Sequence, residues 1–111
     1  MLAKKFRLPI QNWARGENKK FVSQKGKFFI AKIKANDLNF SRLGLIISAK
    51  VSKSAVKRNW LKRTIFNFVR LNKFFGVRGK DILLILLPAV SHLEKMQIEK
   101  EVLLFFQSLN Q

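Results

Sequence analysis

The sequence predicts an α+β fold, a two-layer sandwich in which a small mixed sheet packs against helices. Three observations lead to this expectation. One stretch alternates apolar residues with period two, two short runs are almost wholly apolar, and two longer segments have helical spacing. A chain of 111 residues supports one domain with a modest core. We therefore expect residues 1–111 to form a single domain.

The N-terminal third predicts a short helix and the first strand. Residues 10–15 favour a helix, because proline (Pro9) is tolerated in a first turn and glycine (Gly16) commonly follows a helix end. Residues 28–34 alternate between two faces, as a strand does. One face is apolar and carries Phe29, Ala31 and Ile33. The other face is mixed aromatic, aliphatic and cationic, and carries Phe28, Ile30, Lys32 and Lys34.

The middle of the chain predicts two more strands with a long helix between them. Residues 42–48 (RLGLIIS) follow a turn at residues 36–39 and favour a buried strand. Residues 81–87 (DILLILL) favour a second buried strand, which Pro88 ends. Residues 54–71 contain neither glycine nor proline and favour a helix.

The C-terminal segment predicts a last helix. Ser91 and Glu94 have the spacing of a capping box, and the helix should end near Leu109. Apolar residues recur along it at helical spacing, which is typical of a face that packs on a sheet. These residues are Ile98, Val102, Phe105, Phe106 and Leu109.

Composition excludes several classes of function. Because the chain has no cysteine, it has no disulfide framework, thiol nucleophile or thiolate metal site. Its one histidine, His92, cannot build a histidine metal cluster or an ordinary catalytic triad. The longest apolar run, residues 82–90, is far shorter than the roughly 20 residues of a membrane helix. No hydrophobic signal segment follows the basic N-terminus, so we expect a cytoplasmic protein without a membrane partner.

The distribution of charge points to a polyanionic partner. The net charge is +17, and it divides into +8 for residues 1–37, +11 for residues 38–80 and −2 for residues 81–111. The middle segment contains no acidic residue. A surface with so much charge of one sign repels itself unless a polyanion supplies the opposite charge. Nucleic acid is the partner that this pattern favours, and an anionic membrane surface or simple solubility are the alternatives.

The helix expected at residues 54–71 separates into two faces at 100° per residue. The face expected to pack on the sheet carries Trp60, Leu61, Thr64, Ile65, Phe68 and Leu71. The opposite face is mostly cationic, and basic residues also precede the helix and lie in its first turn. The candidate nucleic-acid-binding residues are therefore Lys50, Lys53, Lys57, Arg58, Asn59, Lys62, Arg63, Phe66 and Arg70. Phe66 would either stack on an unpaired base or be covered by a neighbouring loop.

The segment from Arg42, RLGLIISAKVSKSAVKRNWLKRTI, resembles the protein component of bacterial ribonuclease P. In that family a strand similar to RxGxxxSKK leads into a basic helix similar to AVxRNRxKRxxRE. The matching positions are Arg42, Gly44, Ser48, Lys50, Ala55, Val56, Arg58, Asn59, Lys62 and Arg63. The sequence departs from the family at Trp60, at Phe66 and Asn67, and in the N-terminal aromatic motif, of which only Trp13 matches.

The resemblance implies that the chain is a small basic subunit of a ribonucleoprotein, and that this ribonucleoprotein removes the 5′ leader from precursor tRNA. The RNA subunit would perform the hydrolysis with Mg²⁺, held mainly by the RNA partner and the substrate and not by protein side chains alone. The protein would be a monomer within that assembly, would bind the catalytic RNA, and would hold the leader of precursor tRNA. The resemblance also implies a left-handed βαβ crossover around the basic helix, against the general right-handed preference.

A single-stranded leader needs stacking surfaces and a cationic track. The mixed strand face and the N-terminal helix beside it meet this need, so the expected leader-binding residues are Trp13, Phe28, Ile30, Lys32 and Lys34. The alternative is that Trp13 and Phe28 pack on each other as a satellite core.

The residues offer no protein catalytic site and no protein metal site. The chain has six carboxylates and one histidine, and four of the carboxylates lie in the last 31 residues. Two other functions compete with a ribonuclease P subunit. One is a structural RNA-binding protein of ribosomal type with no role in cleavage. The other is a DNA-binding module that places residues 54–71 in a major groove, although the chain lacks the usual helix-turn-helix pairing.

Overall fold

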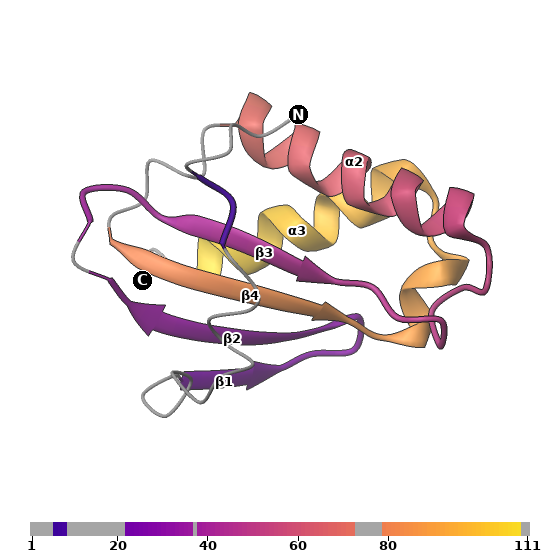
Figure 1. Ribbon diagram of the computed structural model, residues 1–111, viewed down its shortest axis with the longest axis horizontal. Coiled ribbons are helices and arrows are strands. Elements are labelled where there is room, and N and C mark those ends of the chain that lie inside the picture. Colours follow the sequence, from indigo (N-terminus) through magenta and orange to yellow (C-terminus); the bar gives the residue numbers. More distant parts are fainter. Residues whose placement is uncertain (1–5, 9–21, 37, 73–78, 110–111) are drawn as a thin grey trace.

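The computed structural model describes residues 6–8, 22–36, 38–72 and 79–109 (Figure 1). Within these ranges, four strands, two α-helices and one short 3₁₀ helix follow one another along the chain. They are β1 (Val22–Lys25), β2 (Phe29–Ala35), β3 (Arg42–Ile46), α2 (Ala55–Leu71), β4 (Lys80–Leu86), η4 (Pro88–His92) and α3 (Lys95–Leu109). The predicted α+β class is confirmed. The helix predicted at residues 10–15 lies outside the described residues.

The four strands form one mixed sheet in the order β1-β2-β4-β3. β2 is antiparallel to both β1 and β4, and β3 is parallel to β4. Ile82, Leu84 and Leu86 of β4 pack in the core on the side of the helices, and Leu8 covers Leu83 on the other face. Burial on both faces explains the unbroken apolar sequence of β4. The predicted strands at residues 28–34, 42–48 and 81–87 correspond to β2, β3 and β4, with shifts of one or two residues at their ends.

The helix α2 connects the parallel strands β3 and β4. In Figure 1 both strands point to the right, β3 lies above β4, and the helices lie behind the sheet, so this crossover is left-handed. A right-handed crossover is the general rule for parallel strands. The left-handed connection implied by the family resemblance is therefore present in the fold.

The main core lies between the sheet and the two α-helices. Phe29, Ala31 and Ile33 of β2 point into it, as the alternation predicted. The expected stripe of α3 supplies three of its most buried side chains, Ile98, Val102 and Phe106. No helix among the described residues is long and apolar enough to cross a membrane.

The strand β1 is missing from the sequence-based prediction. All four of its residues are exposed, and Val22, its one apolar residue, is 64% exposed. A strand without a buried face has no alternating hydrophobic signal. It forms because its backbone pairs with β2 through a tight turn at Gly26, whose N–H donates to the carbonyl of Phe29.

The predicted capping box at Ser91 and Glu94 is wrong. Pro88 begins the 3₁₀ helix η4, and the hydroxyl of Ser91 donates to the carbonyl of Pro88 within it. The helix α3 begins only at Lys95. There the side-chain oxygen of Gln97 accepts from the backbone N–H of Glu94 at 2.8 Å, which is the reciprocal half of a capping box placed three residues later.

A polar junction ties the start of β4 to β3 and to the end of β2. The carboxylate of Asp81 accepts two hydrogen bonds from Arg42, at 2.8 and 2.7 Å, and one from Asn36 at 2.7 Å. The side chain of Asp81 is 7% exposed and that of Arg42 is 25% exposed. The hydrogen bond from Arg42 to Asp81 raises the pKa of the guanidinium, although burial by itself would lower it. Gly79, just before β4, has a φ of 58°, which side chains with a Cβ rarely adopt.

Candidate nucleic-acid interface

The helix α2 begins as its sequence predicts. Ser54 is its N-cap, and the serine hydroxyl accepts from the backbone N–H of Lys57 at 3.2 Å. Its first turn contains no acidic residue, so no carboxylate complements the helix dipole there. The charge distribution of this helix is therefore unfavourable for an isolated helix and favourable for a helix that faces an anion.

The outward surface of α2 brings together most of the predicted nucleic-acid-binding residues. We call this set the cationic helix surface; it comprises Lys50, Lys53, Lys57, Arg58, Asn59, Lys62, Arg63 and Arg70. Lys57 and Arg58 are half-buried, and the other six side chains are exposed. A shallow hollow of about 410 Å³ lies among Val56, Asn59, Lys62 and Arg63. An amide and two cations at one hollow are suited to phosphate and ribose oxygens.

The predicted place of Phe66 on this surface is wrong. Phe66 is 3% exposed and belongs to the main core, so it is not available to stack on a base. Leu71 was expected to pack on the sheet, and it is 68% exposed. The prediction assumed that the same side of the helix packs on the sheet along its whole length. In the structure the side that is open at Lys62 is covered at Phe66 and Val69, about one and two turns further along the helix.

Trp60 lies at the edge of the helix's buried side. It is half-buried and packs against the main core, as expected for a residue at the border of the packing face. The ammonium nitrogen of Lys57 lies 4.9 Å from the centre of the Trp60 ring. This cation–π contact orients Lys57 along the helix surface.

A second surface is the face of the sheet that points away from α2 and α3. We call it the open face; its residues are Ser23, Lys25, Ile30, Lys32, Lys34, Arg42, Gly44, Ile46, Asp81, Leu83 and Ile85. The strand pairings place Ile30 opposite Ile85, Lys32 opposite Leu83, and Lys34 opposite Asp81. Leu8 covers the centre of this face, where it packs with Leu83, Ile46 and Ile85. The open face therefore has an apolar centre, with lysines along β2.

Two cations of the open face were not predicted as site residues. Lys25 pairs with Ile30 across β1 and β2, and paired residues lie on the same face. It was missed because β1 itself was missed. Arg42 pairs with Asp81 across β3 and β4 at the end of the same face. The resemblance included Arg42, but the sequence offers no sign of the carboxylate, 39 residues later, that holds it.

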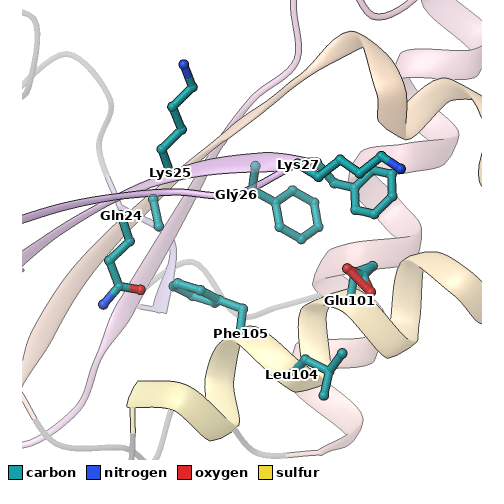
Figure 2. Close-up of a pocket in the computed structure, with 10 residues that line it drawn as sticks. Gln24, Lys25, Gly26, Lys27, Glu101, Leu104 and Phe105 are labelled. Atoms are coloured by element: carbon teal, nitrogen blue, oxygen red, sulfur yellow. The ribbon is translucent and has the colours of Figure 1, made fainter.

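The predicted position of Phe28 on the open face is wrong. Phe28 lies in the turn before β2 and packs against the main core, on the side of the helices. It lines a pocket of about 260 Å³ between the β1–β2 hairpin and α3. Figure 2 shows Glu101 and Phe105 of α3 on the side of the pocket opposite the hairpin, and Leu104 of the same helix also lines the pocket. Because Phe28 still belongs to the turn, the strand alternation begins at Phe29, one residue later than predicted, and Phe28 does not join Ile30, Lys32 and Lys34.

Trp13 lies outside the described residues, and its role stays a prediction. Of the predicted leader-binding residues, the structure brings Ile30, Lys32 and Lys34 together on one face, and all three are half-buried.

The fold and its two surfaces define a class of small cationic α+β proteins in which a basic helix crosses between parallel strands. The family model described as Ribonuclease P matches residues 16–110. The chain belongs to the ribonuclease P protein family.

Curated relatives and solved structures agree with this assignment. The ribonuclease P protein component of Syntrophus aciditrophicus is 37% identical over 76 residues, which cover 68% of this chain and 63% of the relative. That of Chromobacterium violaceum is 41% identical over 54 residues, which cover 49% and 44%. The matched part thus spans less than two thirds of either relative.

Among solved structures, a Staphylococcus aureus RNase P protein mutant with defective mRNA degradation activity has a TM-score of 0.81 and 26% identity, covering 96% of this chain and 89% of that one. The RNase P protein of Thermotoga maritima has a TM-score of 0.80 and 24% identity, covering 92% and 96%. The second likeness supports the fold alone.

Proposed function

We propose that this protein is the protein subunit of ribonuclease P, which binds the catalytic RNA and promotes removal of the 5′ leader from precursor tRNA. The observation that carries the proposal is the cationic helix surface on a chain of this family. Residues 38–80 contain eleven basic and no acidic residues, and most of the basic residues of α2 and the preceding loop are exposed. Catalytic RNA supplies the counter-charge that this surface lacks.

The proposal assigns hydrolysis to the RNA and Mg²⁺. In the described part of the chain, no three His, Cys, Asp or Glu side chains gather where they could hold a metal ion. Asp81, the most buried carboxylate described, is engaged by Arg42 and Asn36. Phosphate oxygens of the RNA and the substrate are suitable Mg²⁺ ligands. The protein's part is to bind, neutralise and orient RNA.

Reconstitution tests this function. We expect the protein to accelerate leader removal when it is added to a catalytic ribonuclease P RNA at low Mg²⁺, because its cations replace part of the screening that Mg²⁺ otherwise supplies. A Lys62→Ala, Arg63→Ala variant should need about 10- to 100-fold more protein for half-maximal acceleration, since contacts to charged groups contribute about 1.5–3 kcal/mol when desolvated and less at a wet surface. The measurement is the initial rate of precursor-tRNA cleavage against protein concentration.

The matched control removes the same charge elsewhere. Lys95 and Lys100 are exposed on α3, so Lys95→Ala with Lys100→Ala should leave the acceleration close to that of the unchanged protein. A protein that binds the RNA tightly but does not accelerate cleavage would instead be the structural RNA-binding protein considered above.

We further propose that the open face of the sheet holds the 5′ leader. Ile30 and Ile85, which are half-buried at the border of the part that Leu8 covers, offer an apolar surface to bases. Lys32 and Lys34 run along the same strand as Ile30, where they can follow a phosphate backbone. The expected contribution of Trp13 to base stacking belongs to this proposal. Phe28 does not, because it packs on the other side of the sheet.

Substrate discrimination tests the leader site. Lys32→Gln with Lys34→Gln should weaken binding of precursor tRNA by the holoenzyme about 5- to 50-fold, because two phosphate contacts are lost at a partly wet surface. Binding of mature tRNA, which has no leader, should change by less than about twofold. Lys95→Gln with Lys100→Gln is the charge-matched control. Equal weakening for both tRNAs would show that the open face does not recognise the leader.

A further inference from the structure

The loop that leads into α2 is tightly organised. We call residues 48–54 the serine loop. The hydroxyl of Ser48 accepts from the N–H of Lys50 at 3.2 Å, and that of Ser52 accepts from the N–H of Ser54 at 3.2 Å. The N–H of Val51 donates to the carbonyl of Ser48 at 3.0 Å. Val51 is 5% exposed and anchors the middle of the loop in the main core. On either side of this anchor, Lys50 and Lys53 are exposed.

One side chain of α2 reaches back to this loop. Nη1 of Arg58 donates to the carbonyl of Ser52 at 2.7 Å, across six residues. The backbone N–H of Arg58 donates to the carbonyl of Ser54 at 3.0 Å. Arg58 is half-buried, whereas Lys62 and Arg63, one turn further along the helix, are exposed. Its guanidinium is therefore committed at least in part to the protein backbone.

The hydrogen bond from the Arg58 guanidinium to the carbonyl of Ser52 ties this part of the loop to the body of the helix. A charge-assisted bond of this length is stronger than a bond between neutral groups. Without it, the carbonyl of Ser52 would turn to water, and the segment between Val51 and Ser54 would sample more conformations. Lys50 and Lys53 would then have to be ordered when RNA binds, which weakens binding.

We propose that Arg58 is a positioning residue, which holds the serine loop so that Lys50 and Lys53 present their ammonium groups together to phosphates of the RNA partner. This inference rests on the proposed function, because it assumes that the cationic helix surface binds RNA. It adds a division of roles within that surface. Lys50, Lys53, Lys62 and Arg63 contact RNA, and Arg58 acts mainly through the first two.

A thermodynamic cycle separates positioning from direct contact. Affinity for the catalytic ribonuclease P RNA is measured for the unchanged protein, Arg58→Ala, the Lys50→Ala, Lys53→Ala pair, and the combination of all three. Arg58→Ala should weaken binding about 5- to 30-fold in the unchanged protein and less than about twofold when both lysines are absent, since residues that act through one another are not additive. Equal losses in the two backgrounds would overturn the proposal and make Arg58 an independent contact.

Arg63→Ala is the matched control. It removes the same type of side chain from the exposed part of the same helix, and its effect should be equal in the two backgrounds. If Lys62→Ala and Arg63→Ala weaken binding while Arg58→Ala and the lysine pair do not, the proposed function stands and this inference fails. If none of these variants weakens binding, the cationic helix surface does not bind RNA, and both proposals fail.

A measurement on the free protein tests the same bond without RNA. In Arg58→Ala, the backbone amides of Val51 and Ser54 should exchange their hydrogens at least about fivefold faster, because local opening of the loop becomes easier. The amides of Leu61 and Ile65, in the buried part of α2, should keep their rates. Unchanged exchange in the loop would contradict the positioning role.

Discussion

Raising the monovalent salt concentration from about 50 mM to about 200 mM should weaken binding of the catalytic RNA by about a thousandfold. Each phosphate neutralised by a lysine or arginine releases condensed counterions, which contributes about 0.7–0.9 to the slope of log affinity against log salt. Roughly six contacts from the cationic helix surface would give a slope near −5. The measurement is the affinity at four or five salt concentrations with Mg²⁺ held constant.

Variants make this expectation specific to the helix surface. Lys62→Ala with Arg63→Ala should make the slope shallower by about 1.4 to 1.8, because two neutralised phosphates are lost. Lys95→Ala with Lys100→Ala on α3 should leave the slope unchanged. A slope shallower than about −2 for the unchanged protein would mean that its charge serves solubility, and the proposed RNA interface would fail.

Asp81→Ala should lower the free energy of unfolding by about 2–4 kcal/mol. The substitution leaves Arg42 and Asn36 without the carboxylate that accepts three hydrogen bonds, and breaking a buried ion pair by removing one partner costs about 3–5 kcal/mol. We expect a somewhat smaller loss because the Arg42 side chain is 25% exposed and water can solvate part of it. Urea unfolding followed by circular dichroism measures the change.

Two comparisons check the cause of this loss. Asp81→Leu combined with Arg42→Leu should be less destabilising than Asp81→Ala alone, because no unpaired charge remains. The raised pKa of Arg42 means that its stabilising contribution is fully present below the ordinary pKa of an arginine and is lost only as the pH rises through the higher folded-state pKa. Arg42 therefore adds no pH dependence near neutrality. A single Asp81→Ala variant as stable as the unchanged protein would show that the junction does not hold the strands together.

The long helix and three of the four strands could be predicted from the sequence because their signals are local. Ser54 is a good N-cap, and the segment after it lacks helix breakers, so the predicted helix agrees with α2 within one residue. The alternation of residues 28–34 is typical of a strand with one buried face, in which every second side chain is apolar. The apolar run at residues 81–87 is typical of a strand that is buried on both faces. The cationic residues of α2 were equally visible, because a run of basic residues without acidic ones is a property of composition.

Some assignments failed where the neighbours of a residue decide its environment. Phe66 has the same place on a helical wheel as the cations around it, but the body of the protein covers that side one turn after Lys62. Phe28 follows the strand alternation, but the hairpin turn directs it to the core beside α3. In each case the local pattern is correct, and packing by distant segments overrides it.

The sequence by itself determined the α+β class, the helix α2 with its charge, and the apolar faces of β2, β4 and α3, because periodicity, capping and composition act over a few residues. Only the tertiary structure decided the strand order β1-β2-β4-β3, the exposed edge strand β1, the pairing of Arg42 with Asp81, and the bond from Arg58 to the serine loop. The first three depend on which backbone and polar groups come into contact between segments that are distant in the sequence. The bond from Arg58 depends on how the loop folds back onto the helix. Hydrogen bonds between groups that are far apart in the sequence produce no periodic pattern of residue types, so the sequence alone does not reveal them.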